Sequence, residues 1–385
     1  MSMMLSLRAA RPTIAAFSVM GILWGSFAAI LPDLKTMLGV DETRLGMLML
    51  FTPIAGVVAM LLAPRIGTAL GRVALPVATV LMALAFALPG QVQILWLFPL
   101  AMLCCGAATG LTDVLMNART AQIEHERGLH LMGLSHAAYS FGYAGGAIAT
   151  GVMRGAEWSP AMVLGTMAGV AFVVAIMTIE RDGRIAGLRA PKGGGGPGLG
   201  MLPVLGGGMV LVAFLTENAA ESWSALHIEQ TLGGSPEQGS MGPAALALTM
   251  GFARLAGNGL AERFGPFRLL KGGAVIASIG AMLAATAVSP PMAYVGFVVM
   301  GIGASVIAPT VFSLVGRLGP DEARGRAVAR ATLFGYFGYF FGPPMLGVIA
   351  GTFGLRYAFV FAAVALMLIL VLAPMMAAVA NRQSK

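Results

Sequence analysis

The sequence is short of charged residues and of cysteine, and both shortages narrow the class of protein. Only 10% of the 385 residues are charged, against about 25% in soluble domains, whereas 58% are hydrophobic. The two cysteines, Cys104 and Cys105, are adjacent within an apolar run, so we interpret them as small packing residues that imply no disulfide framework. With a mean hydropathy of +0.85, the composition predicts an integral membrane protein.

The sequence also lacks the motifs that bind nucleotides, metals or nucleic acids. The glycines at 193–196 are not followed by the Lys-Ser or Lys-Thr pair of a P-loop, and no zinc spacing or nucleophile elbow is present. A formal charge of +8 could indicate a nucleic-acid partner, but the basic residues are scattered through short loops. We therefore predict no cofactor, no metal, no nucleic acid and no catalytic residue. The absence of a P-loop also argues against an ATP-driven pump.

What the sequence does contain is a series of long, continuous apolar runs, each able to cross a hydrocarbon core of about 30 Å. Twelve runs are found, at 12–32, 45–63, 73–90, 92–117, 129–153, 160–179, 202–227, 241–260, 271–289, 291–315, 329–350 and 356–378. If the N-terminus is cytoplasmic, the only loop cations left outside are Lys35, Arg44, Arg154 and Arg356. This asymmetry predicts a multi-pass protein of the cell inner membrane with both termini in the cytoplasm.

A polar break divides the runs into two halves that resemble each other. Residues 63–67, 127–128 and 141–143 match residues 261–265, 324–325 and 337–339 in order, at an offset of about 197 residues. We therefore predict an N-terminal six-helix bundle at 1–180, a flexible cytoplasmic linker at 181–201 and a C-terminal six-helix bundle at 202–385. The fold class is all-α, with twelve transmembrane helices in two pseudo-symmetric bundles.

These features resemble the major facilitator superfamily of secondary transporters along essentially the whole chain. In that family the loop after the second helix of each half carries a Gly-x-Leu-Ala-Asp-Arg-x-Gly type motif, which latches the inner gate. Residues 260–265 are similar, with Glu262 in place of Asp, whereas Pro64 replaces the acidic residue in the first half and puts that latch in doubt. The resemblance implies gating roles for Arg65, Gly67, Glu262, Arg263, Gly265 and Arg268.

Within the superfamily, the chain resembles the MosC-like bacterial carriers, which neighbour the fucose permeases. The resemblance lies in residues 110–117 and in the span that contains Glu217 and residues 223–226. Drug/proton antiporters usually carry Gly-Pro-x-x-Gly-Gly in the fifth span. Residues 142–146 lack the proline, which argues against drug export. The resemblance implies alternating access around a site between the two bundles.

Glu217 and Glu221 are the most informative residues, because they interrupt an apolar run. A charge at bilayer depth costs from about 3 kcal/mol to several times that, so such residues usually face a cavity. Their i, i+4 spacing places both on one helix face. Counted from Pro203 at 1.5 Å per residue, Glu217 lies about 21 Å from the inner edge and Glu221 nearer the outer mouth. We predict proton coupling at Glu217, with Glu221 as a second candidate. The structural alternative for Glu217 is a hydrogen bond to a neighbouring Asn or Arg.

Asp113 and His136 are predicted at comparable depths toward the cytoplasmic end, so Asp113, Asn117 and His136 could form one polar cluster. A carboxylate beside a histidine is a natural proton relay, because imidazole titrates near physiological pH. Alternatively, Asp113 is a fixed inner-gate partner of Arg119 or of a basic residue of the C-terminal half, and His136 is a packing residue.

The remaining candidates are predicted to contact the solute. Arg254 lies well within an apolar run and needs either a carboxylate, for which Glu217 is a candidate, or an anionic substrate. Trp24 and Trp223 occupy similar places in the two halves, as sugar platforms or as packing residues. The predicted substrate-binding set is Trp24, Asn117, Asn218, Trp223, Arg254, Tyr336 and Tyr339, and Asn258 is a further polar residue.

The sequence as a whole predicts proton-coupled symport of a small polar solute, such as a sugar or polyol, by a monomer in the lipid bilayer. Its partners are the solute and protons. Two alternatives stay open: a proton-coupled exporter of amphipathic compounds or drugs, and a membrane enzyme or flippase-like lipid handler.

Overall fold

The computed structural model describes residues 3–186, 188, 200–256, 260–318 and 324–383. Within these ranges the chain forms helices and no β-strand, in agreement with the predicted all-α class. The N-terminal helices are α1 (Met3–Leu38), α2 (Glu42–Met49), α3 (Phe51–Leu70), α4 (Ala74–Gln91), α5 (Phe98–Arg127), α6 (Met132–Gly155) and α7 (Pro160–Ala175). The C-terminal helices are α8 (Leu202–Leu226), α9 (Pro236–Ala256), α10 (Leu260–Phe264), α11 (Pro266–Thr286), α12 (Pro290–Ala304), α13 (Ile307–Leu318), α14 (Arg324–Phe353), α15 (Leu355–Met367) and α16 (Ile369–Gln383).

Local signals in the sequence set several helix ends. Asp41 caps α2, where its side chain accepts a hydrogen bond from the Arg44 backbone N–H at 2.8 Å. Ser159 and Pro160 begin α7, and Gly128 ends α5 with a left-handed φ of 63°. Between these ends the long apolar runs stay helical, because only internal hydrogen bonds satisfy the backbone in lipid.

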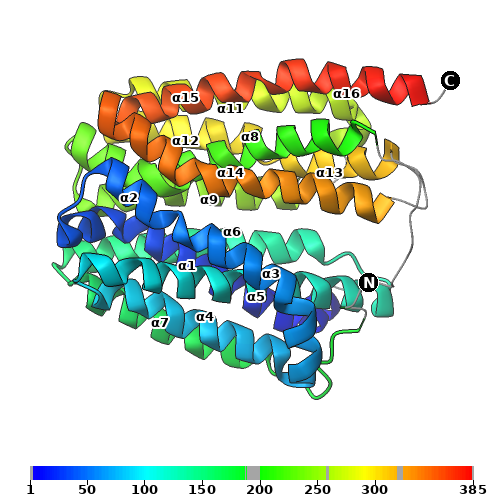
Figure 1. The fold of residues 1–385 in the computed structure, drawn as a ribbon, viewed down its shortest axis with the longest axis horizontal. Helices are drawn as coiled ribbons and strands as arrows, with labels where there is room; N and C mark the ends of the chain where they lie inside the picture. Colours follow the sequence, from blue (N-terminus) through cyan, green and yellow to red (C-terminus); the bar gives the residue numbers. More distant parts are fainter. Residues whose placement is uncertain (1–2, 187, 189–199, 257–259, 319–323, 384–385) are drawn as a thin grey trace.

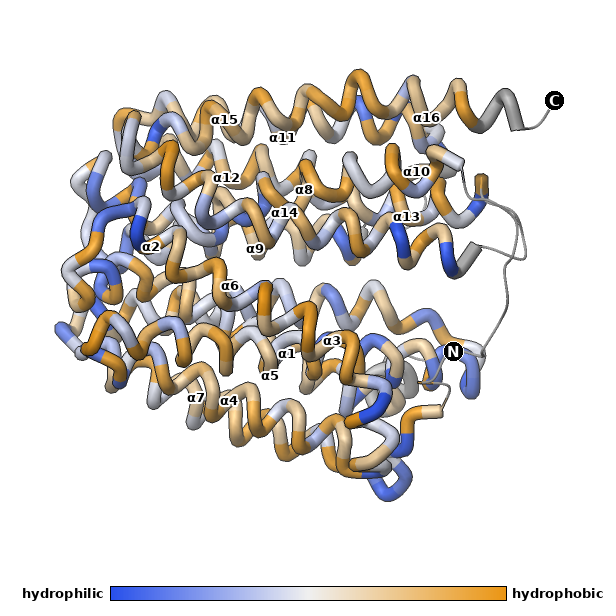
Figure 2. Tube along the Cα trace, in the orientation of Figure 1, coloured by the Kyte–Doolittle hydropathy of each residue, from blue (hydrophilic) through white to orange (hydrophobic). Residues whose placement is uncertain are grey.

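The helices form two bundles that lie side by side, one from α1–α7 and the other from α8–α16 (Figure 1). The start of α1 and the end of α16 lie at the same end of the molecule, which we call the proximal end. The opposite end, where α1 turns into α2, is the distal end. Hydrophilic residues gather at the two ends, and apolar residues dominate the flanks of the outer helices (Figure 2). This distribution fits a protein whose long axis crosses a bilayer.

Each of the twelve predicted apolar runs coincides with one helix or with a consecutive pair, the pairs being α2 with α3, α12 with α13 and α15 with α16. Within the described ranges, nine segments are long and apolar enough to cross a membrane, and one of them, Glu42–Gln91, has 50 residues. The nine do not include α6 and α9, which carry polar residues at the junction of the bundles. The twelve crossings therefore stay a prediction.

The two bundles meet through α6 on α9, from Gly155 beside Glu237 at the distal end to Gly251 beside Ser140, and through α2 on α14 at the distal end. Glycine makes the second contact possible, because a Cβ at Gly46 would overlap the Pro343 carbonyl oxygen. At the same end the Arg154 side chain is 1% exposed and pairs with two carboxylates. Its Nη2 lies 2.6 Å from Asp33 Oδ1 of α1 and its Nη1 lies 2.7 Å from Glu229 Oε1, just after α8. We call Asp33, Arg154 and Glu229 the distal latch, since together they join the two bundles.

The predicted orientation places four cationic side chains outside the cytoplasm. Three of them, Arg154, Lys35 and Arg356, bind acceptor groups of the protein. Arg154 belongs to the distal latch. Lys35 donates to Glu42 and to Gln230 Oε1, the latter at 3.0 Å. Arg356 Nη1 donates to the carbonyls of Ala285 and Ala287, at 2.9 and 2.7 Å, at the end of α11. These cations therefore have structural roles, and they do not weaken the charge asymmetry of the loops.

Close contact of α3 with α5 positions two of the cavity residues described below, and it depends on Gly106. A Cβ at this position would overlap the Thr52 carbonyl oxygen. We expect Gly106→Ala to lower the unfolding midpoint in detergent, because overpacking costs about 1–3 kcal/mol. Gly165→Ala is the matched control, since a Cβ there meets no atom within 4 Å. Equal midpoints for the two variants, measured by thermal unfolding, would contradict this reading.

Candidate functional site

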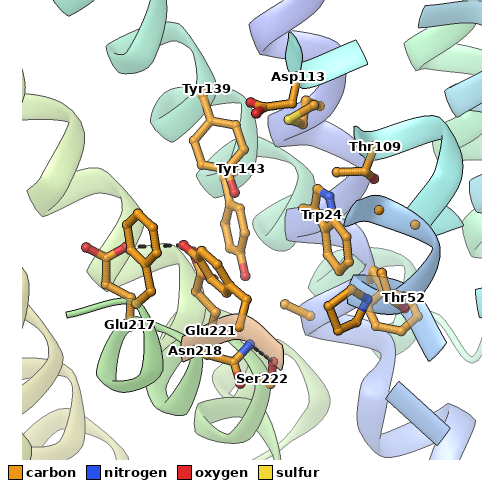
Figure 3. A pocket seen from close by; sticks show the side chains of 18 of the residues that line it. Trp24, Thr52, Thr109, Asp113, Tyr139, Tyr143, Glu217, Asn218, Glu221 and Ser222 are labelled. Carbon is orange, nitrogen blue, oxygen red and sulfur yellow. Dashed lines mark hydrogen bonds between the residues drawn. The ribbon is translucent and has the colours of Figure 1, made fainter. Parts of the chain in front are cut away.

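A cavity of about 300 Å³ lies at the junction of the two bundles. Helices α1, α2, α3, α5 and α6 of the first bundle and α8, α9 and α14 of the second supply its walls. Its polar lining residues are Thr52, Thr109, Asp113, His136, Tyr139, Ser140, Tyr143, Glu217, Asn218, Glu221, Ser222, Arg254, Tyr336 and Tyr339. Figure 3 shows Trp24, Thr52 and Thr109 on one side and Glu217, Asn218, Glu221 and Ser222 on the other. Most of the predicted site residues therefore share one space.

Glu217 and Glu221 both face this cavity from α8, as their spacing predicts. Glu217 is 5% exposed, and the Tyr339 hydroxyl donates to its Oε2 at a long 3.5 Å. Within the described ranges, Glu221 has no hydrogen-bond or ion-pair partner. The two carboxylates repel each other, and Arg254 attracts both of them. Glu221 was expected near the outer mouth, but it shares the central cavity with Glu217.

Asp113 connects the two bundles. The Tyr336 hydroxyl of α14 donates to Asp113 Oδ2 at 3.0 Å, and Asn117 Nδ2, one turn later on α5, donates to Asp113 Oδ1 at 3.1 Å. Hydrogen bonds to an ionised acceptor are stronger than those to a neutral one. An ionised Asp113 therefore accepts a stronger hydrogen bond across the junction than a protonated Asp113 does.

The predicted cluster of three polar residues forms only in part. Asn117 binds Asp113 but is not among the cavity-lining residues. His136 lines the cavity, where its ring packs edge-on against Phe17 with centroids 4.9 Å apart. No hydrogen bond joins His136 to Asp113 in the part of the chain that the structure describes. A direct relay between these two residues is therefore not formed in this conformation.

The alternative role of Asp113 as a partner of Arg119 is wrong in this conformation. Arg119 binds Glu180 through Nε and Nη2, at 3.0 and 2.9 Å, and its Nη2 also donates to the Asp182 carbonyl at 3.1 Å. Six residues separate Asp113 from Arg119, which is about one and two-thirds helical turns, so the two side chains point away from each other. Arg119 instead holds the chain after α7 against α5.

Arg254 does not pair with Glu217 as the sequence suggested. Its Nη1 donates to Ser140 Oγ of α6 at 2.7 Å, and no carboxylate oxygen lies within 4.0 Å among the described residues. Because α9 and α6 belong to different bundles, this is a second polar contact across the junction. Glu217 and Glu221 also attract Arg254, so their charge affects how firmly Arg254 is held against Ser140.

The two tryptophans have different roles. Trp24 lines the cavity, with the edges of Phe27 and Phe86 against it at centroid distances of 5.6 and 5.0 Å. Trp223 is fully buried, lies outside the cavity lining and packs close to Gly347 of α14. Its prediction as a ligand contact is therefore corrected. It follows Glu217 by six residues, which places the two side chains on different faces of α8.

The remaining predicted substrate contacts lie in the cavity wall. Asn218 Nδ2 donates to Ser222 Oγ at 3.2 Å, which leaves Asn218 Oδ1 buried without a partner. Tyr336 and Tyr339 both line the cavity from α14, and Phe214 stacks on Tyr339 with centroids 4.8 Å apart. Whether these side chains bind a solute stays a prediction.

Sequence comparisons agree with this architecture. The family profile of the Major Facilitator Superfamily matches residues 205–385. An uncharacterized MFS-type transporter of Yersinia pestis is 30% identical over 366 residues, covering 93% of this chain and 92% of that protein. The chain belongs to the major facilitator superfamily. The membrane protein MosC of Rhizobium meliloti is 24% identical over 359 residues, covering 90% of this chain and 84% of that protein, which supports the predicted subgroup.

Solved structures show the same fold. A D-xylose-proton symporter superposes with a TM-score of 0.72 at 14% sequence identity, covering 96% of this chain and 97% of that one. Membership of the superfamily makes the protein a multi-pass membrane transporter and not an enzyme.

The gating motif of the superfamily lies at the proximal end. In the first half Arg65 is exposed, and Gly67 is buried where a Cβ would lie 2.6 Å from a Leu115 methyl carbon. In the second half Arg263 stacks over Phe264 at 5.4 Å, and Gly265, with φ of 77°, precedes α11 and the exposed Arg268. The side chains of Glu262 and Asn258 lie outside the described part. The gating roles that the superfamily implies stay predictions.

The sequence did not predict several residues that line the cavity, namely Thr52, Thr109, Tyr139, Ser140 and Tyr143. His136, Tyr139, Ser140 and Tyr143 follow the i, i+3, i+4, i+7 spacing of one helix face, so a helical projection of α6 could have found Tyr139 and Tyr143. Thr52 and Thr109 carry no such signal, because threonine is common on apolar helices, where its hydroxyl can bond the backbone of its own helix and needs no ligand.

Proposed function

We propose that the protein is a proton-coupled symporter that carries a small polar solute, such as a sugar or polyol, by alternating access. The observation that supports this is the cavity at the junction of the bundles, which holds Asp113, Glu217 and Glu221 together. Carboxyl groups at this depth are costly unless they face a cavity and carry out a function, and exchange of a proton is the simplest function for them. The transporter class comes from the family, and the coupling ion and solute class are our proposal.

The contacts across the junction suggest how a proton would be coupled to movement. Tyr336 to Asp113 and Arg254 to Ser140 each join one bundle to the other. The first depends on the charge of Asp113 itself, and the second on the pull that Glu217 exerts on Arg254. Loading or releasing a proton therefore changes the free energy of the closed junction, which is what rocking of one bundle against the other requires.

An alternative function is proton-coupled export of amphipathic compounds. One observation favours it: six methionines line the cavity, namely Met20, Met49, Met60, Met102, Met116 and Met250. Methionine side chains are flexible and accept ligands of varied shape. The missing proline at 142–146 argues in the other direction.

Reconstitution into proteoliposomes separates these functions. We expect an inward-directed proton gradient to drive accumulation of a sugar or polyol from a labelled panel, and an uncoupler that collapses the gradient to stop it. Accumulation of an amphipathic dye against the direction of the gradient would instead establish the exporter. If neither class responds to the gradient at any polarity, proton coupling is wrong.

We also propose that the protein is a monomer of the inner membrane with both termini in the cytoplasm, and that its bundles are divided at 1–180 and 202–385. The shared position of the start of α1 and the end of α16 supports the common side (Figure 1). A green fluorescent protein fused to the C-terminus is expected to fluoresce, and alkaline phosphatase at the same place to be inactive. The reverse pair of results would place the termini outside.

A further inference from the structure

The cavity holds more carboxyl groups than proton coupling uses, and this surplus bears on the charge of the solute. Asp113, Glu217 and Glu221 line the cavity together with one guanidinium among the described residues, that of Arg254. Arg254 can balance one negative charge, and a coupling proton, as in the proposed function on which this inference rests, neutralises a second. His136 packs against Phe17 and makes no hydrogen bond with these carboxylates in the described ranges. One carboxylate is left without a counter-charge.

The structure indicates which carboxylate this is. Asp113 receives hydrogen bonds from Tyr336 and Asn117, and Glu217 receives one from Tyr339. Glu221 has no such partner among the described residues, although it lines the cavity. A carboxylate in a water-poor site needs hydrogen-bond donors or a positive charge. Glu221 is only half-buried, so a solute that displaces water from the cavity must supply the positive charge and donors that the water gave up.

An acceptor atom close to Glu221 also lacks a hydrogen-bond donor. Asn218 lies three residues earlier on the same face of α8, and its Oδ1 is buried without a partner in a side chain that is 8% exposed. A carboxylate and an amide oxygen are both hydrogen-bond acceptors, so their shared ligand must be a donor. An ammonium group supplies several donors and the missing positive charge in one group.

Aromatic rings surround the same space. Tyr139 and Tyr143 lie 5.9 Å apart between centroids, and Trp24 presents its indole from α1 (Figure 3). The faces of such rings attract cations, most strongly where water is excluded. On the first bundle, Thr52 Oγ1 and Thr109 Oγ1 are also buried without partners, so they can bind polar groups elsewhere on the solute.

We propose that the transported solute is a compact organic cation whose charged nitrogen binds Glu221 and Asn218, while Thr52 and Thr109 bind its hydroxyl or other polar groups. The volume of about 300 Å³ is at the lower limit of ligand pockets, which span about 300–1,000 Å³, so the solute is of single-ring size. The same charges exclude anions. Arg254 does not select a carboxylate or phosphate, because it binds Ser140 and shares the cavity with three carboxyl groups.

Binding of compounds that share a skeleton but differ in charge, measured on the purified full-length protein, tests this proposal. The probes are sets that share a skeleton, such as glucosamine with glucose and glucuronate, and tris(hydroxymethyl)aminomethane with pentaerythritol. In detergent at pH 7 and without a proton gradient, we expect the cationic member of at least one set to bind at least tenfold more tightly than its neutral and anionic counterparts, and to raise the unfolding midpoint. A panel in which no cation exceeds its counterparts overturns the proposal.

Variants of Glu221 test whether this residue causes the preference for the cationic compound. We expect Glu221→Gln to bring the cation and its neutral counterpart to within twofold of each other, and Glu221→Asp to keep part of the preference. Glu126→Gln makes the same chemical change at an exposed position of α5 and is expected to leave the preference intact. A tenfold preference retained by a well-folded Glu221→Gln protein contradicts the assignment.

The outcome is separable from that of the proposed function. A protein that prefers cations but ignores the proton gradient would refute the coupling and keep the charge assignment. A protein that accumulates a neutral sugar with protons, and binds no cation more tightly, would refute the charge assignment and keep the coupling.

Discussion

Glu217→Gln is expected to abolish proton-driven accumulation of the solute, with a loss of at least tenfold, while binding and downhill exchange of the solute persist. Glutamine has nearly the same size and can still accept the hydrogen bond from Tyr339, so the local packing is kept. It cannot exchange a proton, and it removes one of the two carboxylates that attract Arg254. We therefore expect the variant to lose proton-driven accumulation while its folding stays unchanged.

The measurement is uptake into proteoliposomes with and without an imposed gradient, at matched protein content. Glu126→Gln is the control, because it makes the same change on an exposed part of α5. Asp113→Asn tests the second coupling candidate and is expected to slow gradient-driven uptake by weakening the bond from Tyr336. If well-expressed Glu217→Gln accumulates the solute as the unmodified protein does, the coupling assignment at this residue fails.

The sequence could predict the fold because the membrane leaves few choices. Long apolar runs must be helices, and the cost of a buried charge directs Glu217 and Glu221 to a cavity. Their spacing then fixes their common face. Each of these steps depends on local sequence and on the bilayer, so no long-range contact was needed.

The pairings of the cations could not be predicted in this way. The partners of Arg154, Asp33 and Glu229, are 121 and 75 residues away along the chain, and Glu180 is 61 residues from Arg119. Hydropathy and spacing carry no information on such distances, and a repeat supplies only the general arrangement. The error at Trp223 is of another kind, because a helical projection of α8 already separates it from the face of Glu217.

The closed distal end and the cavity between the bundles describe one of the conformations that alternating access needs. The latch pairs Arg154 with Asp33 in its own bundle and with Glu229 in the other. Opening at the distal end must break the bonds to Glu229, whereas those to Asp33 can persist. Glu229 thus contributes to the stability of this conformation and not to that of the distally open one.

Arg154→Met is accordingly expected to shift the population toward the distally open conformation and to lower the unfolding midpoint. Removal of one partner from a buried ion pair costs about 3–5 kcal/mol, since the remaining carboxylates lose their counter-charge. Methionine keeps most of the side-chain length, so loss of charge and of hydrogen bonds dominates over loss of packing. Only the part of this cost that belongs to the contact with Glu229 shifts the equilibrium between the two conformations, and about 1–2 kcal/mol changes their ratio roughly tenfold.

Distances between spin labels placed on the distal ends of α1 and α9 would report this shift, as a longer component that grows in the variant. Arg44→Met is the matched control, because Arg44 is an exposed cation at the same end of the molecule. Glu229→Gln should produce the same longer component with a smaller loss of stability, since it breaks the contact between the bundles and leaves the pair of Arg154 with Asp33 intact. A distance distribution that is unchanged in both latch variants would show that the distal end is closed by the packing of α6 on α9 and of α2 on α14, and that the latch does not control the conformational equilibrium.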